Sequence, residues 1–449
     1  MKSRHRLTGR VIFRGDPGYD KARKNWNPFV DTFPLVFVFA QETRDIQNAL
    51  SWACENNVPI RFRSGRHALD KGLSEVKDGI VIDVSEMKRI RFNRKKGIAI
   101  VETGSNVGPT VKALAREGYM LPFGDSPTVG VGGITMGGGI GLLQRSIGLI
   151  SDNLIGLKMV DADGNLIQAD HHRNEDLLWA SRGGGGGNFG VNTEYVYKLH
   201  KAPEKATVFE IDWPWDQLET VFKAWQNWAP DVDTRLGTIL ELFSKKNGTL
   251  RSTGLFLGHK DELEKLLKPL KNAGSPTKVF VKMFTYPDAV DYLIPTQKIP
   301  GRADANKKFS SNWAQDLLPD EAIKVMRQFL EESQSEDTNF FFLNAGGALN
   351  QPSPNETAFY WRNAKFYMEW NASWTDRSDQ ARNLALVEET RLRLKPFVEG
   401  SYVNVPDQFI RNFGPAYYGT NFDRLQRVKA KYDPRNVFQF PQSIPPKYY

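Results

Sequence analysis

The sequence predicts an α+β protein with two domains. Three observations support this fold class. Before about residue 205, short apolar strands alternate with helices and lead into glycine-rich loops. One of these loops, residues 127–153, has seven glycines between Gly130 and Gly141. After residue 205 glycines become few and strand–helix units recur, and a length of 449 residues exceeds one ordinary core.

The first part of the chain alternates strands and helices in an order that the apolar pattern indicates. Residues 33–40 are apolar on both faces, which is typical of a buried strand. Thr43 can cap a following helix, in which Ile46, Leu50 and Ala53 recur at helical spacing. Further strands are expected at residues 58–62, 79–84 and 98–101, with a helix at 107–118 and a hairpin at 157–164.

Residues 127–153 carry the strongest local signal in the sequence. Glycine loses more backbone freedom on folding than any other residue, so this density is costly. In return, bare main chain can approach a ligand closely and offer N–H groups to phosphates or to a flat ring. A flexible linker would be polar, whereas this stretch interleaves glycine with Val129, Val131, Ile134 and Met136. The stretch therefore predicts a cofactor-binding loop.

A second glycine run, residues 183–187, follows an expected helix and precedes an expected strand at 191–199. Gly185, Gly187 and Gly190 formally match the dinucleotide fingerprint. A Rossmann loop follows a strand and opens a helix, which is the reverse of the order here. We therefore exclude a Rossmann fold.

The region after residue 205 is predicted to form a compact α+β domain. Its expected strands are residues 206–213, 252–258, 279–286, 339–343 and 365–374. Its expected helices are residues 218–228, 261–271 and 378–394, and another helix is expected near the end of the chain at 422–432.

Composition excludes several classes of protein. The chain has 60 Lys and Arg against 52 Asp and Glu, which gives a net charge of +8. The basic residues are spread along the chain and form no basic block, so no nucleic-acid partner is expected. Cys54 is the only cysteine, which excludes an intrachain disulfide, and no metal is expected. No stretch has the length of a signal peptide core or a membrane span. We expect no membrane partner, and a cytoplasmic location or export by an unrecognised route; the oligomeric state is left open.

Four motifs occur in a characteristic order. They are R-S-G-R-H at Arg63–His67, S-P-T-V-G-V-G-G at Ser126–Gly133, R-G-G-G-G-G-N-F-G-V at Arg182–Val191 and Y-V-N at Tyr402–Asn404. The ending Y-D-P-R-N-V-F at Tyr432–Phe438 adds a fifth. Together they resemble FAD-linked oxidases of the vanillyl-alcohol-oxidase (PCMH-type FAD-binding) superfamily, in the bacterial type of its berberine-bridge-enzyme-like and oligosaccharide-oxidase branch.

The resemblance implies a specific architecture. Residues 1–200 would form a PCMH-type FAD-binding domain, and residues 398–449 would return to it as a second part. Residues 201–397 would form the substrate-binding domain, an antiparallel sheet covered by helices. The flavin would lie between the two.

His67 is the position at which the family attaches FAD, through an imidazole nitrogen to a methyl carbon of the ring. A neutral imidazole is a good nucleophile near neutral pH; the alternative is a loop histidine with an ordinary hydrogen bond. Doubly attached relatives carry a cysteine where Ser126 stands, and Cys54 lies far from the motif. The resemblance therefore implies one covalent bond, through His67 alone.

Further cofactor contacts follow from the resemblance. They are expected at Arg63, Ser64, Gly65, Arg66, Asp125, Ser126, Thr128, Val129, Gly130, Gly132, Gly133, Gly139, Asp152, Asn153, Gly190, Val191, Tyr402 and Asn404. Val129 occupies the family's oxygen gate and, being small, favours an oxidase. Ile134 stands where many relatives have a histidine near the flavin, so the residue that stabilises the reduced ring stays open.

The expected catalytic residues are Tyr402, Glu369 and Tyr367. Tyr402 and Asn404, two residues apart on a presumed strand, point the same way; in the family the tyrosine faces the substrate and the asparagine the cofactor. Tyr367 and Glu369 alternate similarly. Tyr402, ionised or assisted by Glu369, is expected to take the hydroxyl proton, and Glu369, a better base than Tyr367, is the other candidate base. The alternatives are a buried structural tyrosine and a solvent-facing glutamate. Arg362 would neutralise an acidic substrate or be a surface charge.

The resulting hypothesis is an oxidase that passes a hydride from an alcohol or sugar (oligosaccharide) hydroxyl to FAD and reduces O2 to H2O2. Trp213, Trp215 and Trp361 are expected as exposed rings that stack on the substrate, with core packing as the alternative. A dehydrogenase of the same fold with another acceptor, and a flavin-carrying structural protein without turnover, are the rival hypotheses.

Overall fold

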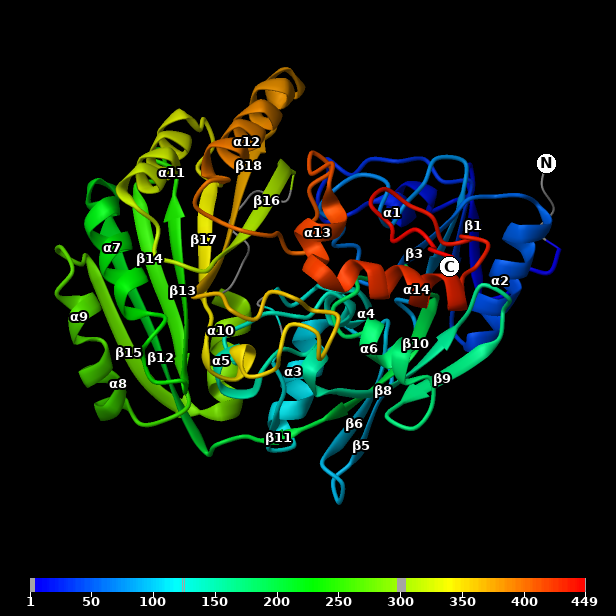
Figure 1. Ribbon diagram of the computed structural model, residues 1–449, viewed down its shortest axis with the longest axis horizontal. Helices are drawn as coiled ribbons and strands as arrows, with labels where there is room; N and C mark the ends of the chain where they lie inside the picture. The colour runs from blue at the N-terminus through cyan, green and yellow to red at the C-terminus, as the bar shows by residue number, and fades with distance from the viewer. Residues whose placement is uncertain (1–4, 123, 125, 297–303, 449) are drawn as a thin grey trace.

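The computed structural model describes residues 5–122, 124, 126–296 and 304–448. Two halves lie side by side (Figure 1). One half is built on a seven-stranded sheet with helices on its outer face, and the other on a four-stranded and a five-stranded sheet. The predicted fold class, α+β with an antiparallel sheet covered by helices, is confirmed. None of the helices in the described ranges is long and apolar enough to cross a membrane.

The four-stranded sheet supports the R-S-G-R-H motif. Its order is β1 (Arg10–Phe13), β2 (Val36–Phe39), β4 (Ile80–Asp83), β3 (Ile60–Arg63). β2, β4 and β3 are parallel, and helix α2 (Thr43–Glu55) packs its apolar side on them. The helix is capped by Glu42 rather than Thr43, with Asp45 completing a capping box. β3 ends at Arg63, so the motif continues from the strand's carboxyl end as a loop.

Both glycine-rich loops lead into strands of the five-stranded sheet. Its order is β5 (Ile90–Asn93), β6 (Ile98–Glu102), β10 (Val191–Lys198), β8 (Leu154–Val160), β9 (Leu166–Asp170), and β8 and β9 form the predicted hairpin. Helix α6 (Glu175–Ala180) precedes the second glycine run and β10 follows it, as predicted. Residues 127–153 contain two helices that the sequence did not predict, α4 (Val131–Met136) and α5 (Gln144–Ile147).

The two halves are joined by a helix–helix contact and by the chain that passes from one half to the other. Helix α1 (Tyr19–Arg23) lies near the N-terminus. Helix α3 (Val107–Arg116) contacts α10 (Tyr286–Thr296) of the other half. β7 (Tyr119–Met120) pairs with β11 (His200–Lys201), where the chain passes to the second half.

The seven-stranded sheet is antiparallel throughout. Its order is β15 (Lys278–Thr285), β12 (Lys205–Pro214), β14 (Thr249–Phe256), β13 (Leu236–Phe243), β17 (Asn339–Asn344), β18 (Phe366–Trp374), β16 (Asn306–Ala314). Its outer face packs in one apolar core with α7 (Leu218–Trp228), α8 (Lys260–Leu266), α9 (Lys268–Lys271), α11 (Asp320–Glu332) and α12 (Gln380–Leu394). The sequence did not predict β13, β16 or α11. The predicted domain boundaries at 200 and 398 stay a prediction.

The inner face of this sheet carries the side chains that alternate with those of the outer core, and it mixes polar with apolar residues. Phe340 and Phe342 of β17 face the outer core, so Phe341 between them faces inward. Glu241 of β13 and Glu369 of β18 lie opposite Phe341 in the strand register. The three residues therefore share one row on the inner face, toward the other half of the molecule.

The C-terminal segment returns to the first half (Figure 1). Helices α13 (Phe413–Tyr418) and α14 (Phe422–Tyr432) share a core with the five-stranded sheet. The strand presumed at Tyr402–Asn404 is wrong: the chain turns there, and the Val405 N–H donates to the Tyr402 carbonyl at 2.9 Å.

The expectation of exposed tryptophans is also wrong. Trp213, Trp215 and Trp361 are all buried. Their indole N–H groups donate to main-chain carbonyls, at 2.8 Å to Ala273 for Trp213 and at 2.9 Å to Phe243 for Trp215. These rings are core residues whose polar atoms are paired inside the protein.

Candidate active site

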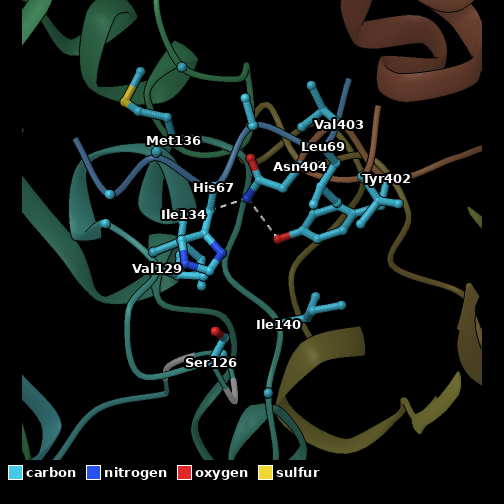
Figure 2. A pocket seen from close by; sticks show the side chains of 18 of the residues that line it. His67, Leu69, Ser126, Val129, Ile134, Met136, Ile140, Tyr402, Val403 and Asn404 are labelled. Atoms are coloured by element: carbon cyan, nitrogen blue, oxygen red, sulfur yellow. Dashed lines mark hydrogen bonds between the residues drawn. The ribbon is translucent and has the colours of Figure 1, made fainter. Parts of the chain in front are cut away.

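A cavity of about 910 Å³ lies where the two halves meet. The loop after β3, both glycine loops, the inner sheet face and the C-terminal turn line it. Figure 2 shows the part formed by the loop after β3, the first glycine loop and the C-terminal turn. The predicted site residues on its wall are Arg63, Ser64, Gly65, Arg66, His67, Ser126, Val129, Gly130, Gly132, Gly133, Gly190, Val191, Tyr367, Glu369, Tyr402 and Asn404. Thr128, Gly139, Asp152 and Asn153 are not on the wall, and Asp125 falls outside the described residues.

His67 is held from two sides. Its imidazole stacks on the indole of Trp26, with ring centroids 5.3 Å apart and planes 13° apart. Its Nε2 lies 2.7 Å from the Thr128 hydroxyl. Thr128 therefore contacts the histidine, although it does not itself line the cavity. Burial lowers the pKa of His67 to about 4, so the ring is neutral at neutral pH. A neutral imidazole is the form that can act as a nucleophile.

The glycine loops present bare main chain to the cavity. A Cβ built at Gly133 would meet no atom within 4 Å, and one at Gly186 would lie 3.8 Å from the Gly133 Cα. Both glycines line the cavity. At Gly65 a Cβ would lie 2.0 Å from the Gly130 nitrogen, so the histidine loop and the first glycine loop are in direct contact. The volume and the flat glycine wall fit FAD.

Arg63 forms ion pairs behind the histidine loop. Its guanidinium contacts Glu75 at 2.8 Å and Asp83 at 2.7 Å, and all three side chains are fully buried. Burial raises the pKa of Glu75 to about 7, so desolvation of the carboxylate outweighs its attraction to Arg63. Arg63 therefore lines the cavity, and its ion pairs also hold the end of β3 in place.

The hydroxyl of Tyr402 is surrounded by N–H donors. The Gly139 N–H donates to it at 2.9 Å. Asn404 Nδ2 donates to it at 3.0 Å (Figure 2). Asn404 Nδ2 also donates to the Ile134 carbonyl at 3.0 Å, and this acceptor fixes the orientation of the amide. Burial raises the pKa of Tyr402 to about 12, so the phenol is neutral at neutral pH. Because its oxygen accepts these bonds, its own proton is available to a ligand.

Tyr367 and Glu369 lie next to Tyr402. The Tyr367 hydroxyl donates to Glu369 Oε2 at 2.7 Å, and the Tyr367 and Tyr402 ring centroids are 5.6 Å apart. Glu369 is half-buried on the cavity wall and does not simply face solvent. Burial and the neighbouring Glu369 charge raise the pKa of Tyr367, which keeps it a donor. The structure thus brings the three predicted catalytic residues together.

Arg362 and Asp152 differ from expectation. Arg362 is buried, and its Nη2 and Nη1 bind the two Asp152 oxygens at 2.6 and 2.8 Å. This pairing uses both charges inside the protein, so Arg362 is neither a surface charge nor free to neutralise a substrate. The Asn153 amide donates to the Leu149 carbonyl at 2.9 Å, and its oxygen lies 2.6 Å from His200 Nε2. Both residues brace the end of the first glycine loop.

The sequence matches known proteins along its whole length. Residues 34–170 match a family model described as an FAD binding domain, and residues 401–445 match one described as berberine and berberine like. The chain is 63% identical to the FAD-linked oxidoreductase YvdP of Bacillus subtilis (strain 168), over 98% of both chains. It is 31% identical to berberine bridge enzyme-like 12 of Arabidopsis thaliana, over 92% of this chain and 84% of the relative.

The chain belongs to the berberine-bridge-enzyme-like family of FAD-linked oxidoreductases. A solved structure of a chitooligosaccharide oxidase has a TM-score of 0.86 to this berberine-bridge-enzyme-like protein at 25% identity, covering 98% of each chain. The resemblance stated from the motifs is therefore confirmed, as is FAD as the cofactor class. The glycine loops and His67 are the residues that would hold FAD.

Proposed function

We propose that this berberine-bridge-enzyme-like protein is an oxidase that carries FAD on His67 alone and oxidises a hydroxyl group of a sugar or another alcohol. The observation that carries the proposal is the cavity itself. His67, Tyr402 and Glu369 line one space between the glycine loops and the inner sheet face. A substrate hydroxyl in that space would be within reach of a carboxylate and a phenol at the same time.

When bound, FAD supplies the hydride acceptor and the site at which O2 is reduced to H2O2. The chain supplies the proton chemistry. Glu369 takes the proton of the substrate hydroxyl, and the Tyr367 O–H bond to its Oε2 holds the carboxylate in place. Tyr402 is neutral and donates its proton in a hydrogen bond to the substrate oxygen, because its own oxygen is occupied by Gly139 and Asn404.

The inner sheet face supports a polyhydroxylated substrate. Phe341 offers a ring on which a sugar can stack, and Asn339 and Asn371 place amides beside it on the cavity wall. The Asn371 amide donates to the Asn339 oxygen, which orients the pair. The chitooligosaccharide oxidase acts on sugars by its name, and its fold is the same.

Oxygen as the acceptor is supported by Val129. This small residue lines the cavity at the loop that contacts the histidine motif. Cys54 is exposed on α2 and does not line the cavity, which supports attachment through His67 alone.

The test is oxygen consumption and peroxide release on a panel of mono- and oligosaccharides and simple alcohols. We expect one H2O2 for each O2 consumed, and flavin that stays in an acid pellet of wild type but not of His67→Ala. Flavin reduction by a substrate without oxygen uptake, but with turnover on a dye acceptor, would instead establish a dehydrogenase.

The base is tested by Glu369→Gln. We expect kcat to fall by about 10² to 10⁴, because a positioned base contributes that factor. The control is Glu356→Gln, an exposed carboxylate that is not on the cavity wall. Wild-type kcat in Glu369→Gln, with normal flavin content, would remove Glu369 from the mechanism.

A further inference from the structure

A pair of residues before β2, Trp26 and Asn27, fastens the histidine loop; we call it the N-terminal clip. The Trp26 indole stacks on His67 at 5.3 Å with planes 13° apart. The Trp26 main-chain N–H donates to the Arg66 carbonyl at 2.9 Å. One residue therefore holds both the imidazole ring of His67 and the main chain just before it.

Asn27 ties the same loop to the half of the molecule that is built on the seven-stranded sheet. Its Nδ2 donates to the Leu69 carbonyl at 3.1 Å and to the Lys307 carbonyl at 2.8 Å. Its Oδ1 accepts the Lys307 N–H at 3.0 Å. Asn27 is almost fully buried, so these bonds are shielded from competition by water. The clip thus bridges the loop on both sides of His67 and strand β16.

The Trp26 ring also has neighbours on the seven-stranded sheet. The Phe309 ring centroid lies 6.2 Å from it, and the Lys307 ammonium lies 5.8 Å from it. Both residues belong to β16. The indole therefore lies close to both His67 and strand β16.

We propose that Trp26 is a positioning residue for the attachment of FAD to His67, an inference that rests on the covalent flavin of the proposed function. Attachment requires an imidazole nitrogen aimed at the flavin methyl carbon, at a near-attack distance of about 3 to 3.5 Å. Trp26 fixes the ring plane and Thr128 fixes Nε2, so the imidazole is presented in one orientation.

The covalent step balances with the acceptor already named. A nitrogen–carbon bond forms, and one N–H bond of the imidazole and one C–H bond of the methyl group break. The two electrons reduce the flavin, and O2 then takes them with two protons as H2O2. Trp26 exchanges no proton or electron in this step, and it acts only through His67.

The experiment compares purified wild type with Trp26→Phe, Trp26→Leu and the control Trp52→Phe. Trp52 belongs to α2, and its ring packs on Phe13 in the apolar core between that helix and the four-stranded sheet. It is in the same half of the molecule as Trp26 but does not line the cavity. For each protein, total flavin is measured by absorbance and covalent flavin by what remains after acid precipitation and washing. The attachment rate is then followed after FAD is added to flavin-free protein.

We expect Trp26→Leu to lower the attachment rate at least tenfold at saturating FAD, with total bound flavin unchanged. Trp26→Phe keeps a flat ring and should retain most of the rate, and Trp52→Phe should match wild type. A Leu variant that attaches FAD at the wild-type rate overturns the role of Trp26. If Trp26→Leu does not fold, Trp26→Met takes its place, since it also lacks a flat ring: an attachment rate at least tenfold below wild type supports the role of Trp26, and a wild-type rate overturns it. FAD that binds wild type without becoming covalent would instead refute the covalent part of the proposed function.

Discussion

At the scale of single residues, the chemistry of His67 depends on its surroundings. A solvated histidine is half protonated near pH 6.5, whereas burial lowers the pKa of His67 to about 4. The neutral, nucleophilic form therefore dominates at every pH above about 5. We expect the rate of FAD attachment to be flat from pH 6 to 9 and to fall only below about pH 5.

This pH dependence is measured by adding FAD to flavin-free protein and quenching samples in acid at intervals. Total bound flavin at each pH is the control for binding. A rate that halves near pH 6.5 would mean that His67 is solvated before attachment.

The residues that the sequence identified are those whose roles are written in local motifs. His67, Tyr402 and Asn404 belong to such motifs, and the cavity contains all three. Trp26 was missed because no local pattern marks a ring that stacks on a residue 41 positions later in the chain. The burial of Arg362 was missed for the same reason, since its partner Asp152 is distant in sequence.

At the scale of elements, strand β16 shows how a polar strand can be buried. Lys307, Lys308, Ser310 and Ser311 are all buried in it. Apolar strands such as β2 and amphipathic helices such as α7 were predicted because their patterns are local. β16 lacks an apolar pattern. It can nevertheless be buried, because the charge of Lys308 is neutralised by residues from two other segments, and these are not visible in the local sequence.

Lys308 joins three parts of the molecule. Its Nζ lies 2.5 Å from Asp70, just after the histidine loop, and 2.9 Å from Asp407, just after the Tyr402 turn. All three side chains are buried. Lys308→Met removes the nearest cation of two buried carboxylates and leaves only Arg391, at 3.9 Å from Asp407, beside them, so we expect the free energy of unfolding to fall by about 3 to 5 kcal/mol.

This loss is measured by urea unfolding of the flavin-free proteins. Lys324→Met, on the exposed side of α11, is the matched control and should change stability little. The triple variant Lys308→Met, Asp70→Asn, Asp407→Asn removes the charges together and should recover part of the loss. Equal stability of Lys308→Met and wild type would show that the cluster does not hold these segments together.

At the scale of the whole molecule, the cavity exists only because the two halves meet. Composition and periodicity predicted the elements of each half, and the motifs predicted by resemblance that the C-terminal segment returns to the first half. Which side chains face each other across the cavity could not be predicted, because this depends on strand register and on loops such as the Tyr402 turn.

The site between the halves should couple FAD binding to stability. In His67→Ala, FAD would bind reversibly, and each tenfold increase in free FAD above its Kd should add about 1.4 kcal/mol to the free energy of unfolding. Under the proposed covalent attachment, wild type already carries its flavin, so added FAD should leave its Tm unchanged. Thermal unfolding at a series of FAD concentrations measures both, with riboflavin as the control ligand that lacks the adenylate half. A wild-type Tm that rises with FAD would mean that the flavin is not attached, and a flat response in His67→Ala would mean that FAD does not bind between the halves.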